Sequence, residues 1–252
     1  HFDSILCVGP RHEEEIRATE SFYDLTPKQL VHAGYGLLDS IMNQDVYEIG
    51  NQPPSASYRV LIAPSWGPDA LLETCGQELV EVLLEANLNV TVRAHIMTMR
   101  QSPNLLAELD GLFGDNPDFT IDLDLASQGT VSNYDLMISD WSGAALEFAF
   151  GLERPVLYVD VPRKVNNWEY ERIGIDPIEV KLRSEIGAIV TLERLRDVPH
   201  LVEELCADTS TWKGRIQELR TQWVYNVGNS GDAGANYIAN LISSGVPSAT
   251  ES

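Results

Sequence analysis

The chain has 252 residues, 44% of them hydrophobic, and it carries 38 acidic but only 17 basic side chains, a formal net charge of −21 at pH 7. Such an acidic chain is not expected to bind nucleic acid generally or to dock on anionic lipid, because both interactions need a basic surface. No apolar run reaches the roughly 18 residues that a transmembrane helix needs. Three widely spaced cysteines, Cys7, Cys75 and Cys206, show no metal-ligand spacing and suit a reducing setting.

The first fifty residues contain fewer predicted elements than the rest. The chain starts with His1 rather than Met, next to an expected strand, so we interpret it as a fragment of a longer protein or as a processed or engineered chain. Hydrophobic periodicity predicts a strand at Ser4–Val8 and helices at Glu13–Tyr23 and Leu37–Asn43. Paired prolines among small polar residues predict a linker at Asn51–Ser57.

Beyond this linker, strands and helices alternate with short connections. That alternation predicts the α/β class, with a Rossmann-like parallel sheet covered by helices on both faces and a helical C-terminal segment. The expected elements are the strands Arg59–Ala63, Asn89–Ala94, Phe119–Leu123, Tyr134–Ser139 and Val156–Asp160, and the helices Glu73–Ala86, Asn104–Phe113, Ser142–Phe150, Leu192–Cys206, Thr211–Gln222 and Asp232–Ser243.

Polar and glycine residues gather directly after the predicted strands. In open parallel sheets, ligands bind outside the carboxyl ends of the strands, so these loops are the candidate site. They are Ser65–Gly67, His95–Arg100, Ser139–Gly143 and Val161–Asn167.

The loop Ser139–Gly143 joins a buried strand to an apolar helix. The first turn of a helix leaves backbone N–H groups without partners, and with the helix dipole they attract anions. Ser142 could add a hydroxyl donor, whereas Asp140 would repel a phosphate if its carboxylate pointed inward. Two interpretations stay open, an anion site and a simple helix cap made by Ser139 or Asp140.

Glu147 is a lone carboxylate among apolar residues, one turn after Gly143. An unpaired carboxylate is costly there, so we expect it to bond to ligand hydroxyls or to backbone donors near the helix start.

Basic residues end two of the strands. Arg93 and His95 could neutralise a diphosphate, and His95 could also move a proton near neutral pH. Arg163 and Lys164 suit a phosphate contact in so acidic a chain. The plainer alternatives are an ordinary hydrogen bond for the histidine and a solvated surface loop for the adjacent cations.

Several stretches follow one another in a distinctive order: VLIAPSWG (Val60–Gly67), VTVRAH (Val90–His95), YDLMISDWSGAALEFAF (Tyr134–Phe150) and RPVLYVDVP (Arg154–Pro162), after an opening FDSILCVGPRHEEEI and HAGYGLLDSI. In this order they resemble the CDP-glycerol glycerophosphotransferase family of teichoic acid and surface-polysaccharide biosynthesis. The family pattern has Ser-Asp-Tyr-Ser-Ser and Arg-Pro-His-Pro, so Trp141, Gly143, Ala94 and Ile96 are departures.

The resemblance implies a GT-B architecture and a polyol-phosphate transferase. Residues 1–50 would be the remnant of an N-terminal acceptor domain with its linker, 51–244 the nucleotide-donor-binding domain with the C-terminal helices, and 245–252 a flexible tail. It implies catalytic roles for His95 and Arg93. The implied donor-binding residues are Ser65, Gly67, Ser139, Asp140, Ser142, Gly143, Glu147, Arg163 and Lys164.

The expected donor is CDP-glycerol or a similar nucleotide, used as a substrate, with no cofactor and no metal. The expected acceptor is a polymer or lipid-linked molecule bound through the missing N-terminal domain, and the expected location is the cytoplasm or the inner face of the membrane. Two alternatives remain: a UDP-sugar enzyme resembling glycosyltransferases or UDP-N-acetylglucosamine 2-epimerases, and a degenerate domain that only binds partners.

Overall fold

The computed structural model describes residues 2–48, 57–123, 131–164 and 170–243. The expected linker, apart from Ser57, and the expected tail therefore lie outside the described residues. The chain divides into two compact units. One comprises His1–Ser40, Glu169–Ile175 and Leu219–Ser252, and the other Ile41–Trp168 and Asp176–Glu218. The final helix at 230–243 thus groups with the first forty residues, whereas the sequence-based division placed it with residues 51–244.

The smaller unit is built on two parallel strands, β1 (Ser4–Cys7) and β2 (Gln29–His32), paired from Ser4 with Gln29 to Cys7 with His32. Its helices are α1 (Pro10–Phe22), α7 (Tyr170–Ile173) and α11 (Ser230–Ser243). The strand β2 was not predicted, because only Leu30 and Val31 of its four residues are apolar. Two helices, α2 (Gly36–Glu48) and α10 (Thr209–Trp223), carry the chain from one unit to the other.

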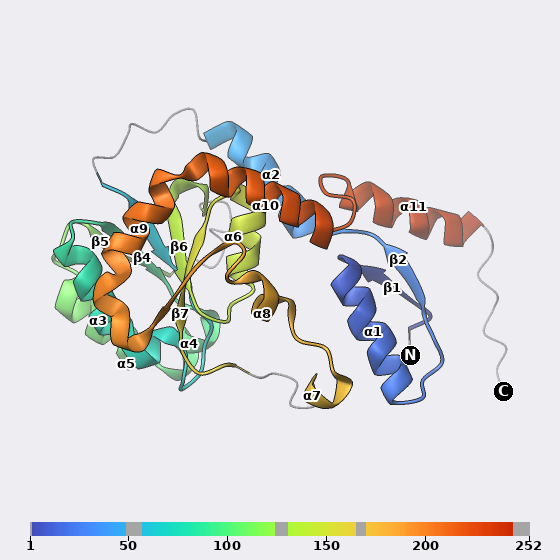
Figure 1. Ribbon diagram of the computed structural model, residues 1–252, viewed down its shortest axis with the longest axis horizontal. Coiled ribbons are helices and arrows are strands. Elements are labelled where there is room, and N and C mark those ends of the chain that lie inside the picture. Colours follow the sequence, from blue (N-terminus) through green and yellow to red (C-terminus); the bar gives the residue numbers. More distant parts are fainter. Residues whose placement is uncertain (1, 49–56, 124–130, 165–169, 244–252) are drawn as a thin grey trace. The chain divides into compact units, whose positions relative to one another are not determined.

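The larger unit contains a six-stranded sheet in which every pairing is parallel (Figure 1). Its spatial order is β5-β4-β3-β6-β7-β8. Renumbered from the first strand of this unit, the order is 3-2-1-4-5-6, that of dinucleotide-binding sheets. The strands are β3 (Arg59–Ile62), β4 (Asn89–Arg93), β5 (Phe119–Asp122), β6 (Leu136–Ser139), β7 (Val156–Asp160) and β8 (Gly187–Thr191). The predicted α/β class is confirmed, and β8 is a strand that the sequence analysis missed.

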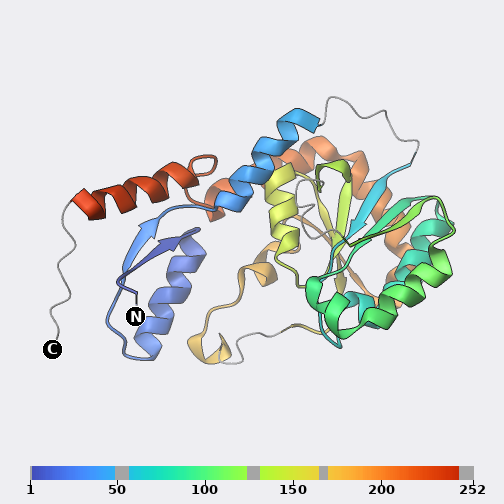
Figure 2. The same ribbon diagram turned by 180° about the vertical axis from the view of Figure 1, so that it is seen from behind.

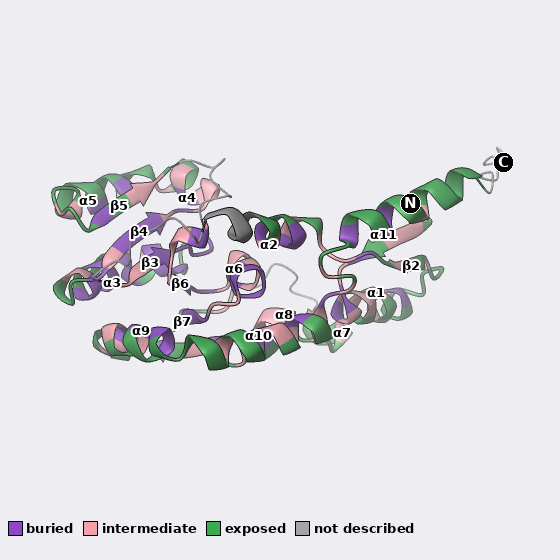
Figure 3. Ribbon diagram, turned by 90° about the horizontal axis from the view of Figure 1, so that it is seen from above, coloured by how far each residue is buried: buried purple, intermediate pink, exposed green. Residues whose placement is uncertain are grey.

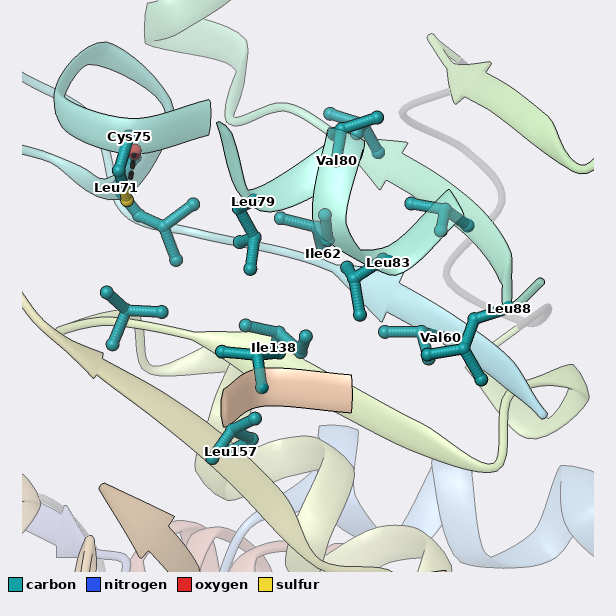
Figure 4. Packing of buried hydrophobic residues seen from close by; sticks show 14 of the residues in the cluster. Val60, Ile62, Leu71, Cys75, Leu79, Val80, Leu83, Leu88, Ile138 and Leu157 are labelled. Carbon is teal, nitrogen blue, oxygen red and sulfur yellow. Dashed lines mark hydrogen bonds between the residues drawn. The ribbon is translucent and has the colours of Figure 1, made fainter. Parts of the chain in front are cut away.

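Helices cover both faces of this sheet. On one face α3 (Leu71–Glu85), α5 (Pro103–Phe113) and α9 (Val198–Ala207) pack on alternate strand residues such as Val60, Ile62 and Ile138 (Figure 4). The residues between them point to the opposite face. There α6 (Ala144–Leu152) packs on β6 and β7, as the view from behind shows (Figure 2).

Burial follows this layering. The central strands are buried almost throughout, while the outer faces of the covering helices are exposed (Figure 3). Three further short elements complete the unit: α4 (Ile96–Gln101), α8 (Ile178–Leu182) and a 3-10 helix at Leu192–Asp197. The sequence analysis expected a loop at 95–100, which is wrong after His95, since the chain forms α4 there.

Candidate functional site

The strand order reverses direction between β3 and β6, and the loops that follow these two strands meet there. Asp140, only 1% exposed, joins them. Its carboxylate accepts hydrogen bonds from the amide of Ser65 at 2.7 Å, the hydroxyl of Ser65 at 3.0 Å, the amide of Leu71 at 3.0 Å and the amide of Trp141 at 2.6 Å. Leu71 is the first residue of α3, so Asp140 occupies the N-terminus of α3 rather than that of its own helix.

The side chain of Ser139 also has a structural role. Its fully buried hydroxyl donates to the carbonyl oxygen of Ala63 at 2.7 Å, which ties β6 to the end of β3. The polar groups of Ser65, Ser139 and Asp140 are therefore engaged by the protein itself. These three predicted site residues shape the carboxyl edge of the sheet, and their side chains bond to the chain.

The start of α6 is different. The amides of Ala145 and Leu146 donate to the carbonyl oxygens of Ser142 and Gly143 at 3.2 and 3.1 Å. Among the described residues, the amides of Ser142, Gly143 and Ala144 and the hydroxyl of Ser142 have no partner. A Cβ added at Gly143 would meet no atom within 4 Å, so the space before these donors is open. The structure thus leaves a helix N-terminus without its own anion.

A small cavity of about 180 Å³ lies between the segments Ser65–Ala70 and Val161–Lys164, which bond to Asp140 and to Trp141 of the loop before α6. The ammonium group of Lys164 closes it by donating to the carbonyl oxygen of Trp66 at 2.7 Å, and it lies 3.8 Å from the centroid of the Trp66 ring. Gly67 has a φ of +123°, a conformation that favours glycine, so the loop can turn tightly here. Four predicted residues, Ser65, Gly67, Arg163 and Lys164, line this one cavity.

His95 lies next to the same loop. Its ring stacks on Trp66 with centroids 6.0 Å apart, and its Nδ1 accepts the amide of Met97 at 3.1 Å, which caps α4. A ring that accepts at Nδ1 carries the proton of its neutral form on Nε2. Burial, together with the charge of Lys164, lowers the pKa of His95. The neutral imidazole is therefore favoured near pH 7.

Arg93 forms an ion pair with the neighbouring strand. Its guanidinium pairs with the carboxylate of Asp122 on the neighbouring strand β5, at 2.9 Å from Nε and 2.8 Å from the Nη2 nitrogen. Arg93 and Asp122 are register partners, so the pairing follows from the alignment of the two strands. The charge of Arg93 is balanced within the protein.

The two remaining predicted residues flank the start of α6. Glu147 lies half-buried one turn into the helix, and its amide donates to the carbonyl oxygen of Gly143 at 3.3 Å. The guanidinium carbon of Arg163 lies 5.8 Å from the ring centroid of Trp141. Trp141 therefore joins the cavity wall to the opening of α6.

Two residues near the site escaped the sequence analysis. Glu73, in the first turn of α3, accepts the hydroxyl of Thr98 at 3.4 Å, and burial raises the pKa of its carboxyl, with the charge of Asp140 acting in the same direction. Arg183, beyond α8, stacks its guanidinium on Trp141. In the sequence, Glu73 marked only the expected start of a helix. No local pattern marks Arg183, because its contacts come from β7 and from the loop before α6.

Burial also lowers the pKa of Lys164, while the charges of Asp140 and Glu73 oppose this. His95, Lys164, Glu73 and Asp140 thus influence one another and form one electrostatic neighbourhood. It lies at the carboxyl edge of the sheet, where a change of one proton alters the local charge balance.

A larger cavity of about 600 Å³ lies elsewhere in the same unit. Its walls include Tyr58, Asp135 and Arg154, which precede β3, β6 and β7 and so mark the amino ends of the strands. Ligands of such sheets bind at the opposite, carboxyl end, so size alone does not select this cavity. Within the part of the chain that the structure describes, no cluster of acidic, histidine and cysteine residues could hold a metal ion, and no helix is long and apolar enough to cross a bilayer.

The six-stranded parallel sheet, covered by helices on both faces, matches the fold of solved structures of GT-B type. The chain is similar to the wall teichoic acid polymerase TagF, an H444N variant soaked with CDPG, with a TM-score of 0.59 and 17% identity. That match covers 96% of this chain and 57% of TagF. A second TagF structure, without that variant, gives a TM-score of 0.58 and 15% identity.

The UDP-GlcNAc 2-epimerase of Methanocaldococcus jannaschii, in complex with UDP-GlcNAc and UDP, is similar to nearly the same degree. Its TM-score is 0.57 at 12% identity, and the match covers 96% of this chain and 61% of the epimerase. The chain therefore spans about three fifths of these proteins. A scan against protein-family models and a search of curated proteins found no match. The shared property is the fold.

Proposed function

We propose that this chain is the donor-binding half of a transferase that moves glycerol phosphate, or a related polyol phosphate, from a CDP-activated donor to a cell-envelope polymer or lipid-linked acceptor. The observation that carries this proposal is the open N-terminus of α6. Ser142, Gly143 and Ala144 present unpartnered amides there, while the nearby Asp140 carboxylate is bound to α3. Such amides suit the diphosphate of an activated nucleotide.

The residues around this opening have complementary roles in the proposal. The amides and the Ser142 hydroxyl hold the diphosphate, and Lys164 and Arg163 add positive charge from the β7 loop. Ser65 and Gly67 shape the cavity wall. Glu147 accepts hydrogen bonds from ribose or glycerol hydroxyls. Ser139 and Asp140 act on the donor indirectly, because their own polar groups hold the loops in place.

His95 and Arg93 are proposed to assist the transfer step. The Nε2–H of a neutral His95 would donate to an oxygen of the transferred phosphoryl group or of the leaving nucleotide. Arg93, paired with Asp122, would contribute potential at the end of β4 without contacting phosphate. Transfer of this kind depends on alignment and on stabilising charge, and it needs no covalent enzyme intermediate. The acceptor would be bound by residues outside this chain.

Calorimetric titration of the 252-residue chain tests the proposal. CDP-glycerol, CDP-ribitol and CMP should bind, and UDP-GlcNAc should bind more weakly. Ser142→Ala should weaken CDP-glycerol binding about fivefold, the loss of one hydrogen bond. Ser21→Ala, on an exposed position of α1 in the other unit, is the matched control and should bind like the wild type. Absence of binding to every nucleotide would overturn the proposal.

A UDP-sugar donor is the alternative that a specific observation favours, since the epimerase complex with UDP-GlcNAc has nearly the same TM-score as TagF. The same titration separates the two. Binding of UDP-GlcNAc without binding of CDP-glycerol would indicate that the site belongs to a UDP-sugar enzyme. The amide donors of α6 would keep their role, because both donors carry a diphosphate.

A further inference from the structure

Arg183 is a buried cation packed against the loop that opens α6. Only 4% of the residue is exposed. Its guanidinium carbon lies 3.9 Å from the ring centroid of Trp141 and 5.1 Å from that of Tyr158. The shorter distance is within cation–π range, and a planar guanidinium can also stack flat on the ring, which a lysine ammonium cannot do.

The charge of Arg183 is only partly balanced. Its Nη1 donates to the Asp160 carboxylate at 3.1 Å, and its Nη2 lies 3.4 Å from the carbonyl oxygen of Val159. The Asp160 side chain is 47% exposed, so water shares that carboxylate. The buried Nε of Arg183 has no hydrogen-bond partner among the described residues. A buried guanidinium with a spare donor therefore lies against Trp141, in the loop before α6.

Trp141 links this cation to the open amides. Its ring N–H donates to the carbonyl oxygen of Val161 at 3.1 Å, and its amide donates to Asp140 at 2.6 Å. With Arg183 on the ring face, the backbone of Trp141 is held from three directions. The next two peptide groups are those of Ser142 and Gly143, whose amides are unpartnered.

We propose that Arg183 is a positioning residue for the phosphate groups bound at the start of α6, which it serves by fixing Trp141 and by adding buried positive charge against the ring of Trp141, one residue before Ser142. This inference rests on the proposed nucleotide-donor function. Because the proposed contribution of Arg183 is electrostatic, the affinity that it adds should grow with the number of phosphates on the ligand. A purely structural role would weaken all ligands equally.

The experiment compares Arg183→Met, which keeps the length and removes the charge, with Arg183→Lys, which keeps the charge and loses the planar stack. Arg194→Met removes an exposed cation of the same unit and is the control for net charge. Replacing a buried ion-paired group by an apolar one of similar volume is often neutral for stability, and Asp160 stays solvated. Thermal unfolding establishes that each variant is folded.

Calorimetry with cytidine, CMP and CDP, and with uridine, UMP and UDP, gives the affinity readout. Arg183→Met should weaken diphosphate binding about tenfold, monophosphate binding less, and nucleoside binding not at all. Arg183→Lys should fall between the wild type and Arg183→Met. Equal losses for nucleoside, monophosphate and diphosphate, or no loss, would overturn the inference while leaving the proposed function intact.

A second readout does not depend on the nucleotide. In protein labelled with 5-fluorotryptophan, the ¹⁹F resonance of Trp141, assigned with Trp141→Phe, should shift when inorganic pyrophosphate is added. Arg183→Met should move this resonance and abolish the response. A response to pyrophosphate without binding of any nucleotide would reject the proposed function and keep the role of Arg183. No response to pyrophosphate in the wild type would reject that role.

Discussion

The N-termini of α3 and α6 lie at the same edge of one sheet, yet the chain treats them in opposite ways. A carboxylate from another segment, that of Asp140, accepts the first amide of α3. At α6 no described carboxylate accepts the amides of Ser142, Gly143 or Ala144. Both helices carry the same partial positive charge at this end. A carboxylate of the chain therefore neutralises the partial charge at the start of α3, whereas the start of α6 stays available to an external anion.

The smaller unit repeats the neutralised arrangement. Asp39, on α2, accepts the amides of Gly228 at 2.7 Å and Ser230 at 2.9 Å, and it also accepts the hydroxyl of Ser230 at the start of α11. Two helix starts, those of α3 and α11, thus receive a carboxylate from a distant segment. The comparison shows two features of a candidate anion site at a helix start. Backbone amides are present there, and the chain supplies no carboxylate that accepts them.

The largest expected effect comes from removing the internal anion at α3. Asp140→Ala should lower the free energy of unfolding by at least about 3 kcal/mol, because it leaves the amides of Ser65 and Leu71 buried without an acceptor. Urea unfolding followed by circular dichroism measures the change. Asp69→Asn, on the exposed loop before α3, is the control and should alter stability by less than about 0.5 kcal/mol. A loss of similar size in both variants would contradict the distinction between the two helix starts.

An intermediate effect should follow from giving α6 its own anion. Gly143 has helical dihedral angles and open space at its Cβ, so Gly143→Asp fits without strain. A carboxylate there should stabilise the fold by about 0.5 kcal/mol and weaken diphosphate binding at least about tenfold. Gly143→Asn has the same size without the charge and should retain most binding. Calorimetry and thermal unfolding on both variants measure the two quantities. Unchanged diphosphate affinity in Gly143→Asp would place the ligand elsewhere.

The smallest expected effect concerns Glu73, whose pKa burial raises above its ordinary value of 4.5. A carboxyl that is harder to ionise in the folded state makes the protein less stable as pH rises through and above that value. Glu73→Gln should therefore be more stable than the wild type at pH 7 and equal to it below pH 4.5. Urea unfolding across this range measures the difference. Glu78→Gln, exposed on the same helix, should show no such dependence.

Much of the architecture could be predicted locally. The apolar runs Val60–Ile62 and Leu136–Ile138 predicted buried strands, and the stripe of Leu79, Val82 and Leu83 predicted a helix face toward the core. The position of the site after the strands followed from the parallel topology. The strand β8 was missed because it begins with Gly187 and Ala188, two residue types that are depleted in strands.

The roles within the site could be predicted only in part. His95 and Lys164 flank Trp66, as their places after β4 and β7 suggested, but nothing local indicated that Lys164 would donate to the Trp66 carbonyl oxygen 98 residues earlier. In the sequence, Arg93 was interpreted as a phosphate contact and Asp122 as part of a strand. Only the register of β4 with β5 shows that they form a pair.

The sequence by itself determined the order of strands and helices, the apolar faces that build the sheet, and the small residues that let a chain turn from β6 into α6. Those properties depend on neighbours a few residues apart, through periodicity and backbone sterics. Tertiary structure alone decided which helix start Asp140 would fill, which aromatic ring Arg183 would cover, and which amides would stay open. Charges pair across whichever segments the packed sheet brings within a few ångströms, and that proximity is set by the whole fold.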